Sequence, residues 1–585
     1  MRFLQTELKN RSVLASGICG VTISSLKRVY REGAGLLTTK SVGPEGRKGH
    51  PGPVIYDWGE GLINAVGLSN PGIDDFISQY SNDSVDFPIA ISIYGKTEAD
   101  FPILAKKLLT LKYDFLEVNI SCPNVLDEFG TPFSFSPELT STITRSVKDV
   151  AEKPVIVKLS PNTHRLIEVA KSAADAGADA LCIMNTLGPG MVINIDTGVP
   201  VLSNRAGGIS GQAVLPLTVR NVFEIYKEVT VPIIGTGGIS SWEGAVQVMM
   251  AGATLYGIGS AVYTEGINIF KHIENGIQAF LQANSFESME EIIGLSHRIK
   301  KVSFYNSSID SSTKKEKEKL PTFTVFPVSD IRKPEKSSVT TIMFQVAAQK
   351  RPSPGQFYML WIPGVDQKPF SVSYSEDGLL GFSFVKRGPF SSALCELKRG
   401  DPVGLLGPLG RGFSLKHKNY LLAGGGIGCA PLVYAARHLK AIGNSVYIIA
   451  GGKDSSSLCW IDEFLPDSNY EIFYCTEDGS FGSKGMVTDH LQSIIDNKRP
   501  EFALLCGPEL FIKKAIDIME ERGIPGEAGL ERMMKCGMGL CGSCVLDHTG
   551  ERVCMEGPVF SFSDISRIHE FGKYRRDESG TIEDL

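Results

Sequence analysis

Short, almost wholly apolar runs alternate over the first 300 residues with stretches in which apolar residues recur every three or four positions. The apolar runs are residues 14–18, 35–40, 88–93, 115–120, 155–159, 180–185, 231–235 and 254–259. Runs of this kind predict parallel strands with both faces buried. The stretches between them, such as 163–176 and 242–251, predict amphipathic helices. Eight strand–helix units favour a (β/α)8 TIM barrel over residues 1–302, with a doubly wound open sheet as the alternative.

The pattern changes in the second half of the chain. Residues 303–321 are rich in Ser and then in Lys and Glu, which predicts a flexible linker. Short strands with Gly and Pro turns over residues 322–416 predict a small antiparallel β-barrel. Residues 417–527 return to alternating strands and helices, which predicts a Rossmann-like α/β domain, and residues 528–585 are a compact, Cys-rich part. The predicted fold class is therefore α/β.

Composition and charge narrow the function. A chain of 585 residues is too long for one hydrophobic core, so we expect several domains. Its net charge of −6 does not indicate the basic surface that nucleic-acid-binding proteins usually have. The N-terminus has no signal-peptide pattern, and no apolar run is long enough to cross a bilayer. We expect a soluble, cytosolic protein with no membrane or nucleic-acid partner. Its 12 cysteines are then metal-binding, catalytic or packing residues rather than disulfides.

Four cysteines near the C-terminus form the most specific motif. They are Cys536, Cys541, Cys544 and Cys554. The spacing C-x4-C-x2-C followed by a fourth Cys is typical of a plant-type [2Fe–2S] cluster. A structural zinc site and unlinked buried cysteines are the alternatives. Besides Cys122, seven cysteines lack such spacing and are interpreted as packing residues: Cys19, Cys182, Cys395, Cys429, Cys459, Cys475 and Cys506.

A glycine-rich turn ends a predicted strand and begins a helix in the Rossmann-like part. Residues 421–431 read Leu-Leu-Ala-Gly-Gly-Gly-Ile-Gly-Cys-Ala-Pro, and Cys506-Gly507 ends a later strand. Such a turn lets a pyrophosphate approach a helix N-terminus, although tight packing alone also explains it. In the preceding small barrel the chain reads Lys368-Pro369-Phe370-Ser371, and a second turn begins at Gly388.

This order resembles the ferredoxin–NADP reductase superfamily, in which the barrel holds FAD and the Rossmann domain holds the nicotinamide nucleotide. The resemblance implies FAD contacts at Lys368, Pro369, Phe370, Ser371 and Gly388. It implies NAD contacts at Gly424, Gly425, Gly426, Gly428, Cys506 and Gly507. The superfamily motif Arg-Pro-x-Ser has Lys at 368 here, which keeps the charge and loses the bidentate fork. With the cluster motif added, residues 322–585 resemble the electron-transfer subunit of class 1B dihydroorotate dehydrogenases.

Polar side chains follow three of the predicted barrel strands, in segments 118–124, 157–162 and 183–186. These positions lie at the C-terminal mouth, where the active sites of such barrels form. Two Gly-rich turns, 235–238 and 257–260, follow the last two strands and are typical of a phosphate grip in flavin-binding barrels.

Residues 1–300 resemble the catalytic subunit of dihydroorotate dehydrogenases, most specifically through the run Asn119-Ile-Ser-Cys-Pro-Asn124. The resemblance makes Cys122 the catalytic base. It implies substrate contacts at Lys40, Asn64, Val66, Gly67, Leu68, Asn119, Asn124, Asn185 and Thr186. It implies FMN contacts at Ala15, Ser16, Gly17, Lys40, Ser41, Asn119, Lys158, Gly211, Gly237, Gly238, Gly259 and Ser260. The loop 125–133 departs from the family pattern through its acidic and aromatic residues.

The combined resemblance implies oxidation of dihydroorotate to orotate in pyrimidine biosynthesis, with electrons passing from FMN to [2Fe–2S], FAD and NAD⁺. It also implies a dimer of fused chains, in which the halves pair within one chain or between chains. The alternatives are an oxidoreductase of dihydrouracil or dihydrothymine, a dihydrouridine synthase acting on RNA, and a non-catalytic redox sensor. The Asn set and Lys40 favour a carboxylated ring, and the net charge of −6 disfavours RNA.

Overall fold

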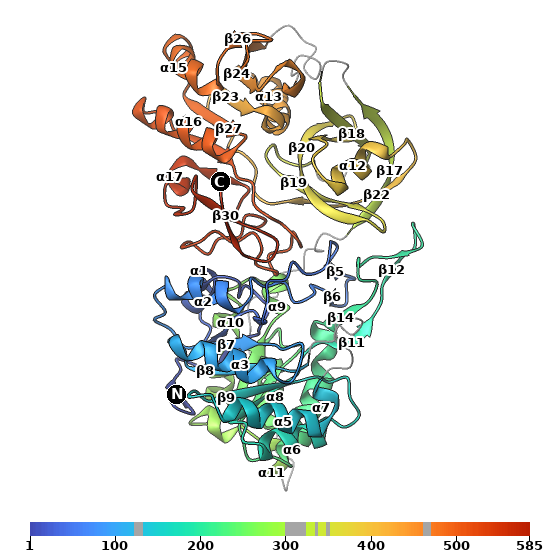
Figure 1. The fold of residues 1–585 in the computed structure, drawn as a ribbon, viewed down its shortest axis with the longest axis vertical. Helices are drawn as coiled ribbons and strands as arrows, with labels where there is room; N and C mark the ends of the chain where they lie inside the picture. The colour runs from blue at the N-terminus through green and yellow to red at the C-terminus, as the bar shows by residue number, and fades with distance from the viewer. Residues whose placement is uncertain (122–132, 299–322, 334–336, 347–350, 460–469) are drawn as a thin grey trace.

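The computed structural model describes residues 1–121, 133–298, 323–333, 337–346, 351–459 and 470–585. Two barrels, a mixed sheet and a compact C-terminal segment make up this part of the chain (Figure 1). No helix within it is both long enough and apolar enough to span a bilayer. The predicted linker 303–321 lies outside the described residues.

Eight parallel strands close the first barrel, in the order β10-β15-β16-β3-β4-β7-β8-β9. The strands are β3 (Ser12–Leu14), β4 (Leu36–Thr38), β7 (Ile89–Ile93), β8 (Phe115–Asn119), β9 (Val155–Leu159), β10 (Ala180–Ile183), β15 (Ile233–Thr236) and β16 (Leu255–Ile258). The prediction of a (β/α)8 barrel is confirmed, and the open-sheet alternative is wrong because β16 pairs with β3 and closes the circle.

The first predicted strand, 14–18, is displaced. Strand β3 covers Ser12–Leu14, and the chain then leaves the barrel through a turn at Gly17, whose φ of +89° suits glycine. Residues 15–18 therefore lie at the barrel mouth rather than in its wall.

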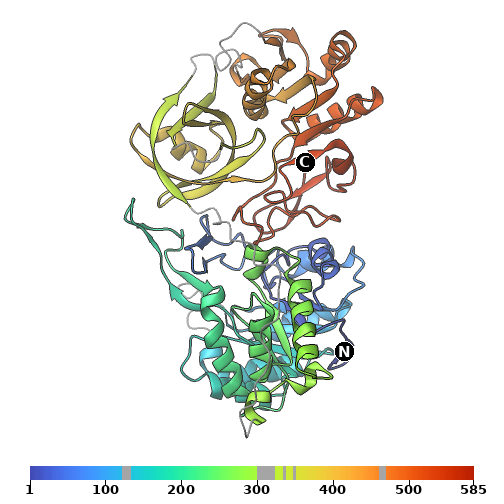
Figure 2. The same cartoon turned by 180° about the vertical axis from the view of Figure 1, so that it is seen from behind.

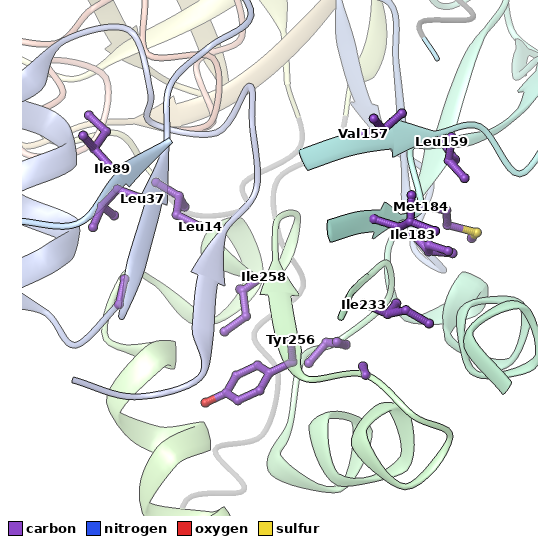
Figure 3. Close-up of a cluster of buried hydrophobic side chains, with 14 of the residues drawn as sticks. Leu14, Leu37, Ile89, Val157, Leu159, Ile183, Met184, Ile233, Tyr256 and Ile258 are labelled. Carbon is purple, nitrogen blue, oxygen red and sulfur yellow. The ribbon is translucent and has the colours of Figure 1, made fainter. Parts of the chain in front are cut away.

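Successive residues of the barrel strands contribute to two different apolar clusters, one on each face of the strand. Leu14, Leu37 and Ile258 belong to a large cluster shared with the surrounding helices, part of which Figure 3 shows. Their neighbours Val13 and Leu36 belong to a separate small cluster that also includes the N-terminal residues. Both faces of each strand are thus buried, which explains why the sequence shows apolar runs and no alternation.

Helices surround the barrel, and three of them begin at a side chain that caps the first turn. They include α1 (Ile23–Arg31), α2 (Ile73–Ser81), α3 (Asp100–Lys107), α5 (Pro137–Lys148), α6 (Leu166–Asp175), α7 (Leu215–Tyr226), α8 (Trp242–Met250) and α10 (Ile269–Ala283). The side chains of Thr22, Ser136 and Ser241 each accept a hydrogen bond from a backbone N–H in the first turn of α1, α5 and α8, respectively.

An antiparallel sheet beside the barrel mouth was not predicted from the sequence. Its strands are β11 (Leu187–Gly190), β14 (Gly207–Ser210), β6 (Leu62–Asn64) and β5 (Ile55–Asp57). A hairpin, β12 (Ile193–Asn194) and β13 (Val199–Pro200), extends from it toward the second barrel (Figures 1 and 2). Val201 shares an apolar cluster there with Trp361 of the second barrel.

Six antiparallel strands close the second barrel, as the sequence predicts. They are β17 (Thr324–Arg332), β18 (Val339–Gln345), β21 (Leu379–Val385), β20 (Asp366–Glu376), β19 (Phe357–Ile362) and β22 (Pro402–Leu409), in spatial order. A short helix, α12 (Pro389–Glu396), lies against β20.

A seven-stranded sheet follows, in the order β26-β25-β24-β23-β27-β28-β29. The strands are β23 (Asn419–Gly425), β24 (Ser445–Gly452), β25 (Glu471–Thr476), β26 (Ser483–Lys484), β27 (Phe502–Cys506), β28 (Gly526–Gly529) and β29 (Val559–Ser561). All pair in parallel except β29. The strand order reverses direction between β23 and β27, the position at which open α/β sheets bind ligands.

The C-terminal segment lies between the sheet and the first barrel (Figures 1 and 2). Arg28 of α1 forms an ion pair with Glu556 at 2.8 Å, and Arg576 donates a hydrogen bond to Gln79 of α2 at 2.5 Å. These contacts join the two halves of one chain directly, without the linker.

Candidate active site and cofactor sites

One large pocket opens at the C-terminal mouth of the first barrel, with about 1310 Å³ of empty space including its open end. Most of the residues predicted to bind substrate or FMN line it. They are Ala15, Ser16, Gly17, Lys40, Ser41, Asn64, Val66, Gly67, Leu68, Asn119, Lys158, Asn185, Thr186, Gly237, Gly238, Gly259 and Ser260.

Three predicted residues do not appear in that lining. Gly211 follows the lining residue Ser210 and begins a short 3-10 helix. Cys122 and Asn124 lie outside the described residues. Ser121, just before them, accepts a hydrogen bond from Asn185 Nδ2 at 2.9 Å.

Hydrogen bonds hold the asparagine side chains in place around the pocket. Asn119 Nδ2 donates to Ser41 Oγ at 3.0 Å, and Asn64 Nδ2 donates to the Gly208 carbonyl at 3.3 Å. These side chains come from different strands, and amides fixed in this way suit a ring that carries imide and carboxylate groups.

Two lysines enter the pocket, but only one has an acidic partner among the described residues. The Lys40 ammonium donates to Ser69 Oγ at 3.0 Å, and burial lowers the pKa of Lys40 to about 8. Lys158 Nζ lies 4.0 Å from Glu117 Oε1, and both side chains are almost fully buried.

Glu117 itself was not predicted from the sequence. It lies on β8 and accepts a hydrogen bond from Ser92 Oγ at 2.8 Å. Ser92 Oγ and Ser41 Oγ are hydrogen-bonded at 2.8 Å, and Ser41 Oγ and Ser16 Oγ are hydrogen-bonded at 3.2 Å. A chain of hydroxyl groups therefore connects this buried acid to the pocket wall. A single Glu in an apolar run gives no signal of such a role in the sequence.

The glycine-rich turns after β15 and β16 supply the opposite wall. Gly237 and Gly238 have φ angles of +134° and +77°, which side-chain-bearing residues rarely adopt. A Cβ on Gly238 would lie 2.5 Å from the backbone nitrogen of Leu215, where α7 begins. Only glycine therefore fits between this turn and the start of α7. A tight glycine turn at the N-terminus of a helix is consistent with the phosphate site predicted for FMN.

The four motif cysteines are buried and form two pairs. Cys536 and Cys541 are close enough to interact, as are Cys544 and Cys554. The neighbouring Cys536 holds the pKa of the Cys541 thiol well below its ordinary value. In the described part of the chain, no three His, Cys, Asp or Glu side chains gather around a single ion position. Two pairs suit a cluster with two irons better than one tetrahedral zinc.

Residues 536–544, which carry three of the four motif cysteines, form a loop that we call the cluster loop. Leu540 and Cys541 of this loop also line the barrel pocket. The loop is held there by Cys19, whose backbone N–H donates to the Leu540 carbonyl at 3.2 Å and whose thiol donates to the Gly539 carbonyl at 3.7 Å. Cys19, interpreted from the sequence as a packing residue, is buried and also bonds to the cluster loop. Of the other six packing cysteines, only Cys395 is partly exposed.

The residues predicted to bind FAD lie on β20 and at the start of α12. Lys368 is held by Asp366 at 3.3 Å and Glu578 at 3.4 Å. Phe370 packs against the Phe390 ring with centroids 5.9 Å apart. Gly388 precedes α12 with open space where a Cβ would lie, and Pro369 and Ser371 pair with Met359 and Phe357 of β19. The site therefore offers a helix N-terminus and a lysine that is already paired with two carboxylates.

The residues predicted to bind NAD meet at the switch point of the seven-stranded sheet. The turn at Gly424, Gly425, Gly426 and Gly428 joins β23 to α13 (Cys429–Ala441), Cys506 ends β27, and Gly507 follows it. A Cβ on Gly428 would lie 2.5 Å from Gly507 Cα and 2.6 Å from the Cys506 carbonyl oxygen. Glycine is therefore required for packing here, and the arrangement also suits a pyrophosphate.

Comparisons with known proteins match two parts of the chain, the first barrel and the segment that carries the motif cysteines. Residues 1–281 match the family model of dihydroorotate dehydrogenase, and residues 531–566 match the iron-sulfur cluster binding domain of dihydroorotate dehydrogenase B.

Two curated relatives match the first half. The catalytic subunit of dihydroorotate dehydrogenase B (NAD(+)) from Methanosarcina acetivorans is 43% identical over 296 residues, covering 50% of this chain and 94% of the relative. The subunit of the same name from Pyrococcus abyssi is 41% identical over 293 residues, covering 50% of this chain and 97% of its own. A solved chain from work on NADH-dependent reduced ferredoxin-NADP oxidoreductase is 26% identical over 41% of this chain and 89% of its own, at a TM-score of 0.38.

Proposed function

Because the chain belongs to the dihydroorotate dehydrogenase family of oxidoreductases, we propose that it oxidises dihydroorotate to orotate and delivers the electrons to NAD⁺. The observation that carries this proposal is the shared wall of the barrel pocket. Lys40, Asn64 and Asn185 line the same pocket as Cys541 of the cluster loop. A substrate oxidised there would therefore lie beside a one-electron carrier.

Each group in the pocket has a task in this proposal. Asn64, Asn119 and Asn185 would hold the imide and ring N–H groups of the substrate, and the Lys40 ammonium would face its carboxylate. Cys122 remains the predicted base, one residue after the buried Ser121. Lys158 would stabilise negative charge on the flavin, with Glu117 fixing its position.

The cofactors supply chemistry that the side chains lack. When bound, FMN would accept the hydride, and the [2Fe–2S] cluster and FAD would carry the electrons to NAD⁺. Residues of the Gly237–Gly238 and Gly259–Ser260 turns would hold FMN, and the four motif cysteines would hold the cluster. Residues 368–371 and Gly388 would hold FAD, and the Gly424–Gly428 turn with Cys506 and Gly507 would hold NAD.

The test is anaerobic NADH formation when dihydroorotate is added to the cofactor-loaded chain. Cys122→Ser is expected to slow reduction of the pocket flavin. Cys536→Ser is expected to abolish NADH formation and spare that first reduction. Cys395→Ser, a partly exposed cysteine outside every proposed site, is the matched control.

Three outcomes would contradict parts of the proposal. Flavin reduction without NADH would remove the electron-transfer half. Flavin reduction by dihydrouracil but not by dihydroorotate would replace the substrate. Bound cofactors without reduction by any dihydropyrimidine would favour a redox sensor.

A further inference from the structure

A second, smaller cavity lies beside the cluster loop, with about 240 Å³ of empty space. Its walls come from three parts of the C-terminal segment. Arg532 precedes the cluster loop, Ser543 belongs to it, Val545 and Asp547 follow it, and Glu570, Tyr574, Arg575 and Arg576 come from the last 20 residues. The cavity therefore connects the cluster loop with a group of buried charges.

Most of the charges in this group are paired. Asp547 accepts from Arg576 Nη2 at 3.0 Å and from the Tyr574 hydroxyl at 3.0 Å. Arg532 is directed to Glu509, to which Nη1 donates at 2.6 Å and Nη2 at 3.3 Å. Each guanidinium is thus already used by one carboxylate.

Glu570 is the carboxylate left over. It is 3% exposed, its Oε1 accepts from the Asp547 N–H at 3.1 Å, and Arg532 Nη2 is 3.8 Å away. Its Oε2 is buried and has no hydrogen-bond partner in the described part of the chain. Arg575 also lines the cavity, but it lies 3.8 Å from its own acidic neighbour Glu583. The carboxylates of Glu509, Asp547 and Glu570 are then left with the guanidinium groups of Arg532 and Arg576, and a proton on the least well-paired acid removes the surplus negative charge. Burial raises the pKa of Glu570 to about 7.

The cluster loop lies on the other side of the cavity. Ser543 lines the cavity and stands between Cys541 and Cys544 in the chain. We propose that Glu570 is a redox-linked proton site, which binds one proton when the neighbouring cluster gains one electron and releases it when the electron leaves. This inference rests on the proposed function, because the cluster is assigned there.

The physical reason is the electrostatic interaction between the charge of the cluster and the charge of Glu570, because the protein interior screens charges poorly. An added electron on the cluster makes proton binding at Glu570 more favourable, and a bound proton makes reduction more favourable by the same amount. The midpoint potential of the cluster should then fall as pH rises through the range in which Glu570 titrates.

Other titratable groups surround Glu570 and must be separated from it. Arg532, Glu509, Asp547, Tyr574, Arg575 and Arg576 face it or its immediate partners. The rings of His548 and His569 lie 4.5 Å apart near the same segment. The assignment therefore requires a variant of Glu570 itself.

The experiment is a redox titration of the cluster in the purified full-length chain, followed by electron paramagnetic resonance between about pH 5 and about pH 9. The parent potential is expected to fall with pH, and that of Glu570→Gln to stay constant. Glu551→Gln, a nearby carboxylate that does not line the cavity, should keep the parent slope. Glu509→Gln frees Arg532 to pair with Glu570, so the fall should move to lower pH.

A parent potential independent of pH, or an unchanged slope in Glu570→Gln, would overturn this inference and leave the proposed function intact. If Glu570→Gln does not fold, an unshifted curve in Glu509→Gln overturns it instead. Absence of any cluster signal in the parent would overturn both the proposed electron path and this inference.

Discussion

The two buried groups of charge in this protein have opposite surpluses. At the mouth of the first barrel, the ammonium groups of Lys40 and Lys158 face one described carboxylate, Glu117. Around the cavity beside the cluster loop, the carboxylates of Glu509, Asp547 and Glu570 face the guanidinium groups of Arg532 and Arg576, while Arg575 lies beside its own partner Glu583. The first surplus is positive and the second is negative.

The difference indicates what each cavity binds. An uncompensated buried charge is costly, so it persists where a ligand neutralises it. The barrel pocket is wide and its surplus is positive, which suits an anion such as a carboxylate or a phosphate. The second cavity is small and its surplus is negative, so a proton is sufficient. The predictions below test this charge counting, from the largest expected effect to the smallest.

Lys158→Met should have the largest effect, because it leaves Glu117 ionised in the barrel interior without its cation. We expect a loss of about 3–5 kcal/mol in the local unfolding free energy of β8 and β9. Hydrogen exchange of the amides in these strands measures it in the full-length chain. The double variant Glu117→Gln/Lys158→Met should recover most of the loss. A double variant as unstable as the single one would show that the charge is not the cause.

Asp547→Asn removes a carboxylate that is fully paired, in contrast to Glu570. It leaves Arg576 without its ion partner and weakens the hydrogen bond from Tyr574. We expect about 3 kcal/mol of destabilisation at neutral pH, measured by hydrogen exchange around the 545–552 hairpin. A stabilising effect would mean that the surplus lies on Asp547 and that the charge counting is wrong.

Glu570→Gln should have the opposite sign, and its effect should depend on pH. The folded chain holds a proton near pH 6 that the unfolded chain, with a pKa near 4.5, has already lost. The contribution of this group to stability is therefore complete below about pH 4.5 and is lost as pH rises through about 7. The glutamine variant avoids this loss.

Relative to the parent, Glu570→Gln should gain about 1–3 kcal/mol in the unfolding free energy of the C-terminal segment at pH 8, and much less at pH 4.5. Hydrogen exchange at the two pH values measures both. A gain that is the same at the two pH values would show that Glu570 does not titrate between them.

The sequence predicted the fold well where strands and helices pack by simple periodicity. The barrel strands and the glycine turns could be assigned because buried parallel strands appear as apolar runs. The sheet containing β5 and β6 was missed because its strands have only three or four residues each and lack the continuous apolar runs of the barrel strands. Their pairing with β11 and β14 depends on contacts that are distant in the chain, such as Asn64 with Gly208.

The pocket lining could be predicted largely from the family resemblance, but the charge balance could not. Glu117 sits in an apolar run, and nothing near it in sequence shows that Lys158 lies across the barrel. Glu570 and Arg532 are 38 positions apart and share no motif. A surplus of charge is a property of three-dimensional neighbours, so only the structure reveals it.

Arg28→Ala should have the smallest effect, because Glu556 at the contact between the two halves has two cations. It pairs with Arg28 at 2.8 Å and with Arg552 at 2.9 Å. Partial burial works against the charged form of Glu556, but hydrogen bonds from both guanidinium groups lower its pKa to about 2. Loss of the partly exposed Arg28 leaves Arg552 in place, so we expect at most about 1 kcal/mol, and less at high salt. Unfolding midpoints of parent, Arg28→Ala and Arg28→Lys at low and high salt measure it. A loss of several kcal/mol in the free energy of unfolding would mean that Glu556 needs both cations. Counting charges alone would then underestimate how much the geometry of this contact contributes to stability.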